Sequence, residues 1–186
     1  MEIGTLLPSA TEIVCVLGLE NHLVGISHEC DFPTSIADLP KLTSSSIGEH
    51  KNSRDIHQSV ESLLKSSLSV YDLDLELLKF LKPDYLITQD LCDVCAVSFK
   101  QVKDACNKVL GSDTKIISLR PQRLEDIWED IRNVAQELEV IEAYNEFKAD
   151  VDSRIEYISN KIAGNSSAKQ SFVRLFPCVS WRERVP

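Results

Sequence analysis

The chain has 186 residues and a formal net charge of −9, with 43% apolar and 26% charged residues. This composition is typical of a folded globular protein with one sizeable core, and it excludes a largely disordered chain. The acidic balance argues against binding to nucleic-acid phosphates or to anionic membrane surfaces. No apolar run reaches the roughly 18 residues that a bilayer-spanning helix needs, so membrane insertion is not expected.

The chain alternates short apolar segments with helical patterns. The first apolar segment, residues 3–7, precedes a short helix that we expect to begin with a capping box of Ser9 and Glu12 and to end at Gly18. Residues 33–69 are rich in serine and predict loop and short helix. Further strands are predicted at 23–26, 85–88 and 115–119, and helices at 73–81, 97–110 and 124–138. This alternation predicts an α/β fold with a parallel sheet and right-handed crossovers.

Unusual polar residues follow directly after the predicted strands. They occupy residues 8–12, 28–31, 89–95 and 120–121. The carboxyl ends of parallel strands share one edge of a sheet, and ligands bind in the crevice outside that edge. The four segments are therefore predicted to converge on one binding site.

A helical pattern continues from residue 141 to residue 163, which corresponds to a rod of roughly 30 Å. We expect an N-terminal α/β lobe at 1–138, a long connecting helix at 139–163 and an irregular tail at 164–186. Ile155, Ile158 and Ile162 lie on one stripe of this helix. With no second lobe to cover that stripe, self-association or fraying beyond about residue 155 is expected.

Residues 1–2 lead directly into the first strand, so the sequence as written predicts a cytoplasmic protein without a secretory signal. In that compartment the six cysteines are expected to remain thiols or metal ligands. Cys15 and Cys106 fall at apolar positions of helical patterns, so we expect them to be small core residues.

Three segments in this order resemble the cobalamin-binding members of the periplasmic binding protein family, the substrate-binding components of ABC importers for cobalamin and iron chelates. The segments are residues 6–13 (LLPSATEI), 25–33 (GISHECDFP) and 82–90 (KPDYLITQD). The resemblance covers residues 2–163. It implies a class III binding-protein fold, in which two α/β lobes are joined by one long helix and enclose the ligand between them. The lobe in this chain is then expected to be a three-layer α/β lobe with a parallel sheet. Compared with that family, the sequence as written is expected to lack an export signal and to stop where the C-terminal lobe would begin.

A corrinoid is a large apolar disc fringed with amides, so its site needs apolar surface and a few hydrogen-bonding groups. The turn at Pro8, Ser9 and Thr11 offers hydroxyls and backbone N–H groups, although Ser9 and Glu12 could also serve only to cap the helix. His28 could be an axial ligand of the metal or a structural residue. The remaining predicted ligand-binding residues are Glu29, Asp31, Phe32, Gln89 and Asp90.

Cys92 and Cys95 form a C-x-x-C pair, which is half of a tetrahedral zinc site or a redox pair. Cys30 and His28 could complete a Cys₃His set for zinc or iron. Thioredoxin-type chemistry fits less well, because no aromatic residue precedes Cys92. As a third interpretation, Cys92 and Cys95 are simply buried cysteines with no metal or redox role.

The sequence thus favours a corrinoid-binding protein, not an enzyme, that works with an ABC transporter permease. No G-x-G-x-x-G follows any strand, which argues against a dinucleotide site. Two alternatives stay open: a cytosolic protein with a Cys/His metal centre, and a truncated form without function.

Overall fold

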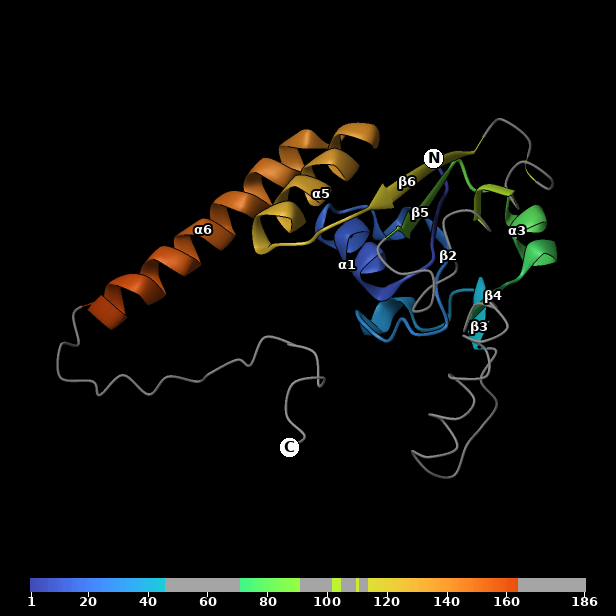
Figure 1. Ribbon diagram of the computed structural model, residues 1–186, viewed down its shortest axis with the longest axis horizontal. Helices are drawn as coiled ribbons and strands as arrows, with labels where there is room; N and C mark the ends of the chain where they lie inside the picture. Colours follow the sequence, from blue (N-terminus) through green and yellow to red (C-terminus); the bar gives the residue numbers. More distant parts are fainter. Residues whose placement is uncertain (46–70, 91–101, 105–109, 111–113, 164–186) are drawn as a thin grey trace, which may run out of the picture. The chain divides into compact units, whose positions relative to one another are not determined.

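A computed structural model describes residues 1–45, 71–90, 102–104, 110 and 114–163 (Figure 1). The chain divides into two compact units, Met1–Ala149 and Asp150–Pro186. The division falls inside the long helix because the side chains of Ile141, Tyr144 and Phe147 pack against the core of the first unit. The first unit contains the sheet and the candidate site.

A four-stranded parallel sheet forms the centre of the first unit (Figure 1). Its spatial order is β2 (Leu23–Gly25), β1 (Ile3–Thr5), β5 (Tyr85–Gln89) and β6 (Lys115–Leu119). Each neighbouring pair is parallel. The predicted α/β class is confirmed, and every strand boundary lies within two residues of its predicted position.

Helix α1 (Pro8–Val16) begins two residues earlier than predicted. Leu7 occupies the N-cap position with extended backbone angles, and no side chain caps the helix. Pro8 takes the first helical position, where its fixed φ fits and its missing N–H costs no hydrogen bond. The predicted capping box was wrong, since Ser9 already lies inside the helix. The predicted end is confirmed by Gly18, whose φ of +75° is a conformation that glycine adopts without strain.

A second, antiparallel sheet of two strands was not predicted. Strand β3 (Thr43–Ser45) pairs with β4 (Tyr71–Leu73). The segment between β2 and β3 contains one short 3₁₀ turn, η2 (Thr34–Ile36), within the predicted loop region. Another short 3₁₀ turn, η1 (Glu20–His22), precedes β2. The rest of the loop prediction, residues 46–70, lies outside the described residues.

The later helices match their predicted positions closely. Helix α3 (Leu75–Leu81) begins where the carboxylate of Asp74 accepts a hydrogen bond from the backbone N–H of Leu77 at 2.9 Å. It ends before Pro83, as predicted, with Lys82 in the left-handed region. Helix α5 (Leu124–Glu137) follows β6. Of the helix predicted at 97–110, residues 102–104 are helical and most of the remainder lies outside the described residues.

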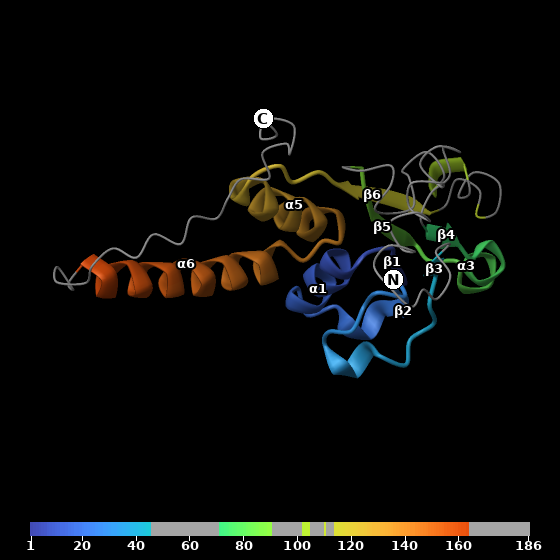
Figure 2. The same cartoon turned by 60° about the horizontal axis from the view of Figure 1, so that its bottom comes forward.

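An apolar layer covers each face of the sheet, because successive side chains of a strand point to opposite faces. Ile87 and Ile117 belong to the layer that also includes buried residues of α1 and α5. Their neighbours Leu86 and Ile116 belong to the opposite layer, which includes Leu78 of α3. Figure 2 shows α1 and α5 on one side of the strands and α3 on the other. The first unit is therefore a three-layer α/β lobe.

Leu42 packs against two strands at their glycines. A Cβ on Gly25 would lie 2.8 Å from Cγ of Leu42, and a Cβ on Gly4 would lie 3.1 Å from Cδ1 of Leu42. Leu42 is fully buried, so any larger residue at Gly25 would displace it. This contact fixes the start of β3 next to the end of β2.

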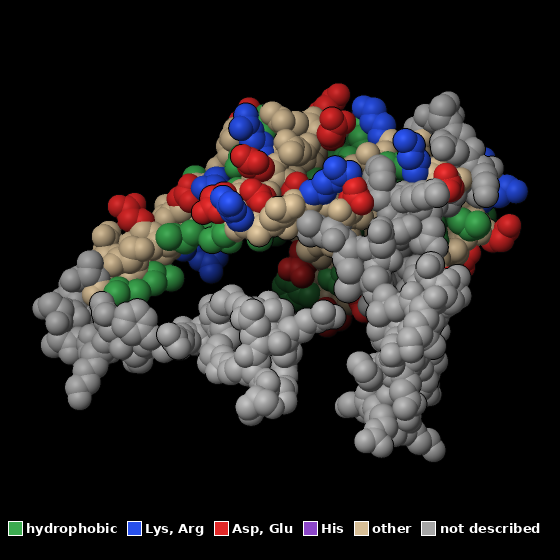
Figure 3. Space-filling view, viewed as in Figure 1, with side chains coloured by type: hydrophobic (Ala, Val, Ile, Leu, Met, Phe, Trp, Pro, Cys, Tyr) green, Lys and Arg blue, Asp and Glu red, His purple; other side chains and the backbone are tan. Residues whose placement is uncertain are grey.

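Helix α6 (Ile141–Ala163) has the predicted bounds. Ile155, Ile158 and Ile162 are 48%, 56% and 70% exposed. Figure 3 shows apolar side chains along one edge of this helix. Among the helices that the structure describes, none is both long and apolar enough to cross a membrane.

Candidate functional site at the carboxyl edge of the sheet

The predicted site residues within the described part of the chain follow the carboxyl ends of parallel strands, so they lie at one edge of the sheet. From β1 the chain passes to β2 on one side, and β5 lies on the other side of β1. The strand order therefore changes direction between β1 and β5, and in open α/β sheets such a switch point forms the ligand crevice. Pro8 follows β1 and Asp90 follows β5, which places both beside this switch point.

Thr11 lies beneath the edge and not on its surface. Its side chain is fully buried, and its Oγ1 lies 2.6 Å from Oγ1 of Thr5 and 3.1 Å from Sγ of Cys30. The Thr11 hydroxyl also donates to the carbonyl oxygen of Leu7 at 3.3 Å. Thr11 thus joins β1, α1 and the loop after β2, and in this structure it supports the predicted ligand-binding surface from below.

Cys30 is part of the same buried network and is 5% exposed. Burial raises the pKa of its thiol, although the hydrogen bond with Thr11 acts in the opposite direction. Cys15 is half-buried, and burial followed by the charge of Glu20 raises its pKa to about 11. Both groups are therefore thiols near neutral pH, which makes them weak nucleophiles. The interpretation of Cys15 as a small core residue agrees with its packing against the main apolar cluster.

His28 is half-buried and contacts β3. Its Nδ1 lies 2.7 Å from Oγ1 of Thr43, and its backbone N–H donates to the same oxygen at 3.1 Å. Thr43 Oγ1 also lies 3.1 Å from Oγ of Ser27. Sequence reasoning missed Thr43 and Ser27, because a hydroxyl side chain by itself carries no signal of burial.

The surface residues of this edge include two carboxylates and an aromatic ring. Ser9, Glu29, Asp31 and Phe32 are exposed, and the ring of Phe32 is 62% exposed. Such an exposed ring beside hydrogen-bonding groups suits a large apolar ligand with polar edges.

Charged groups connect the ends of β5 and β6. The guanidinium of Arg120 forms an ion pair with the carboxylate of Asp90, and the backbone N–H of Arg120 donates to Oδ2 of Asp130 at 3.1 Å. Burial raises the pKa of the Asp130 carboxyl, while this hydrogen bond lowers it. The backbone N–H of Asp90 donates to the carbonyl oxygen of Leu119 at 3.2 Å. Gln89 and Asp90 are half-buried here.

The predicted metal set is only partly visible. Cys92 and Cys95 lie outside the described residues. Within the described ranges, no group of three or more His, Cys, Asp or Glu side chains is arranged to hold a metal ion. The four-ligand site of His28, Cys30, Cys92 and Cys95 therefore stays a prediction.

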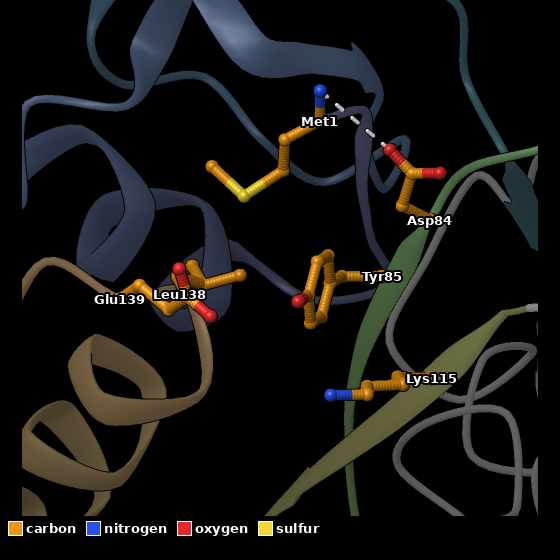
Figure 4. A pocket seen from close by; sticks show the side chains of 6 residues that line it. All are labelled: Met1, Asp84, Tyr85, Lys115, Leu138 and Glu139. Atoms are coloured by element: carbon orange, nitrogen blue, oxygen red, sulfur yellow. Dashed lines mark ion pairs between the residues drawn. The ribbon is translucent and has the colours of Figure 1, made fainter.

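A pocket lies at the opposite, amino edge of the sheet (Figure 4). Asp84 directly precedes β5, and Lys115 begins β6. The carboxylate of Asp84 accepts a hydrogen bond from the backbone N–H of Glu2 at 2.7 Å. The pocket is lined by Met1, Asp84, Tyr85, Lys115, Leu138 and Glu139. It contains none of the predicted site residues, and ligands of open α/β sheets bind at the other edge.

No protein-family model matches the chain, and no curated protein matches it. The solved structures that are similar to the chain include three periplasmic proteins. A periplasmic heme binding protein from Pseudomonas aeruginosa is 20% identical with a TM-score of 0.59, over 88% of this chain and 47% of its own. The periplasmic vitamin B12 binding protein of Vibrio cholerae is 19% identical with a TM-score of 0.57, over 88% and 51%.

The third structure is a possible iron-binding, periplasmic solute-binding protein from Staphylococcus epidermidis. It is 20% identical with a TM-score of 0.56, over 86% of this chain and 50% of its own. This chain thus spans about half the length of the structures it matches. It has the α/β fold of part of a periplasmic solute-binding protein.

Proposed function

We propose that the carboxyl edge of this lobe binds a corrinoid, or a related metal-chelating macrocycle such as haem. The chain would then act as the substrate-binding part of an ABC importer and deliver its ligand to the permease. It would not be an enzyme. The proposal is supported by the fold, which is shared with proteins named for binding vitamin B12, heme and iron.

One observation carries the proposal. Segments with candidate ligand-binding side chains follow β1, β2, β5 and β6, and the parallel sheet brings their starting points to a single edge with a switch point between β1 and β5. A macrocycle is wide enough to contact several such loops at once. The candidate contacts at the surface are Pro8, Ser9, His28, Glu29, Asp31, Phe32, Gln89 and Asp90, with Thr11 beneath them.

The chemistry of these groups fits the edge of a macrocycle. Corrinoids carry amide side chains and haem carries propionates, so both present acceptor oxygens, and the amides also present donors. Glu29 and Asp31 can accept hydrogen bonds, whereas Ser9, His28 and Gln89 can donate them. The ring of Phe32 supplies apolar surface for a macrocycle face.

Isothermal titration tests the proposal directly. The chain is titrated with cyanocobalamin, with cobinamide and with hemin, because the three differ in charge and in their axial groups. We expect saturable binding of at least one, with a micromolar dissociation constant corresponding to about −8 kcal/mol. No saturable heat with any of the three at protein concentrations well above micromolar would refute the proposal.

A matched pair of phenylalanines shows whether the carboxyl edge is the binding surface. Phe32 is 62% exposed at this edge, and Phe80 is 82% exposed near the C-terminus of α3, which precedes β5 at the amino edge. Phe32→Ala should weaken binding about fivefold to tenfold, corresponding to the loss of about 1 kcal/mol of ring contact. Phe80→Ala should leave the affinity unchanged. Equal effects of both substitutions would place the ligand elsewhere.

A further inference from the structure

Two buried hydroxyl groups lie beside each other on β5 and β6. Thr88 and Ser118 are register partners of these parallel strands. Thr88 is fully buried, and the side-chain oxygen of each residue is buried without a hydrogen-bond partner in the described part of the chain. Buried hydroxyls in folded proteins are nearly always hydrogen-bonded, either to protein or to an ordered water molecule. The pair therefore needs a partner that the described residues do not supply.

The surroundings of the pair on the inner side are apolar. Side chains two residues apart on a strand share one face of the sheet. On the face of Thr88 and Ser118, the preceding pair of register partners is Leu86 and Ile116, which belong to the second apolar cluster. Leucine and isoleucine side chains offer no acceptor, so the partner of the hydroxyls cannot come from this pair.

The surroundings toward the carboxyl edge are charged. Asp90 is the next residue after Thr88 on this face of β5, and its carboxylate forms the ion pair with Arg120. The backbone N–H of Asp90 still donates to the carbonyl oxygen of Leu119, so the pairing of the two strands continues to this point. The side chain of Asp90 is 31% exposed. A carboxylate that can accept hydrogen bonds thus lies directly above the two hydroxyls.

The spacings fit a single bridging molecule. Residues two apart on a strand are separated by about 6.6 Å, and neighbouring strands by about 4.8 Å. A water molecule with two hydrogen bonds joins oxygens about 5.5 Å apart. The hydroxyls bond neither to each other nor to Asp90. One water molecule can reach all three groups, because both spacings are close to the length that it bridges.

We propose that one ordered water molecule occupies this position. It accepts hydrogen bonds from the hydroxyls of Thr88 and Ser118 and donates one to the carboxylate of Asp90. These are the three hydrogen bonds typical of a buried water. Thr88 and Ser118 then act as positioning residues for Asp90, which is a candidate contact of the proposed binding surface. The water site itself does not depend on the proposed function, since it exists without ligand.

A high-resolution crystal structure of the ligand-free chain tests the site directly. We expect a water oxygen within about 3 Å of the side-chain oxygens of Thr88 and Ser118 and of the carboxylate of Asp90. A direct hydrogen bond between the two hydroxyls would overturn the proposal. So would a protein side chain in the place assigned to the water.

Urea unfolding tests the site in solution through the sign of an effect. If a water satisfies the Thr88 hydroxyl, Thr88→Val removes a hydrogen bond and should lower the folding equilibrium constant about fivefold. If the hydroxyl has no partner, the same substitution removes an unsatisfied buried group and should raise that constant. The double variant with Ser118→Ala should lose less than the product of the two single losses, because both act on one water. A raised constant in Thr88→Val, or independent losses, would overturn the proposal.

Carbon-13 NMR of the Asp90 carboxylate tests the positioning role. Thr88→Val and Ser118→Ala should each shift its carboxyl carbon signal, because each variant changes the water that donates to it. Thr114→Val is the matched control, since the Thr114 hydroxyl donates to the carbonyl oxygen of Pro83 at 2.7 Å at the amino edge. This control should leave the Asp90 signal unchanged. An Asp90 signal that is unchanged in all three variants, or equally shifted in all three, would contradict a water shared with Asp90.

Discussion

The two halves of the carboxyl edge are held together by different interactions. At the β1–β2 half, buried neutral hydroxyls and a thiol connect Thr5, Thr11 and Cys30, and a second group connects His28 with Thr43. At the β5–β6 half, the ion pair of Asp90 and Arg120 lies near solvent. Buried hydrogen bonds are not weakened by salt, whereas exposed ion pairs are screened and contribute little. The β1–β2 half is therefore the preorganised part of the site.

The largest effect should come from breaking the packing that places β3 next to β2. In Gly25→Ala the new Cβ would meet Cγ of Leu42 at 2.8 Å, so Leu42 must move and Thr43 with it. We expect a loss of up to about 3 kcal/mol in the free energy of unfolding, measured with urea. The His28 network should also be disturbed in NMR spectra.

Gly18→Ala is the matched control for Gly25→Ala. Gly18 has a φ of +75°, and a Cβ there would meet nothing within 4 Å. Only backbone strain of about 1 kcal/mol is expected, with no change at His28. If Gly18→Ala destabilised the chain more than Gly25→Ala, the contact with Leu42 would not be what positions β3.

The next effect concerns the buried hydroxyl bond between Thr5 and Thr11. Thr11→Val keeps the shape of the side chain but leaves the Thr5 hydroxyl without this partner, at a cost of about 1–2 kcal/mol in the free energy of unfolding. Adding Thr5→Val removes the unsatisfied group, so the double variant should lose less than the sum of the two single losses. Additive losses in urea unfolding would show that the two hydroxyls do not interact.

The smallest effect is expected at the charged half. Asp90→Asn removes the ion pair with Arg120 at a site where the Arg120 side chain is 60% exposed. The free energy of unfolding should fall by less than about 1 kcal/mol at low salt, and the difference should disappear in high salt. A larger loss that persists in high salt would mean that the two halves are equally preorganised.

The sequence predicted the elements that depend on local pattern. The apolar strands, the stop at Gly18 and the full extent of α6 all follow from periodicity and from the backbone preferences of glycine and proline. The common edge at which the polar segments begin also followed, because it depends only on the strands being parallel.

The sequence could not predict what depends on contacts between distant segments. Strand β3 has only three residues, too few for an alternation pattern, and its pairing with β4 is a long-range contact. Thr11 and Ser9 are equally polar in sequence, and only the fold decides that Thr11 faces inward while Ser9 is exposed. The role of Leu42 beside Gly4 and Gly25 likewise exists only after the sheet has formed.

The most direct test of the binding surface is amide hydrogen exchange with and without ligand, using cyanocobalamin or whichever of the three macrocycles binds by titration. We predict slower exchange at residues 27–32 and 89–90 on the carboxyl edge when ligand is bound. Residues 83–85 and 114–115 on the amino edge should exchange at unchanged rates. Protection confined to the amino edge, or no protection at 27–32 under saturating ligand, would contradict the account.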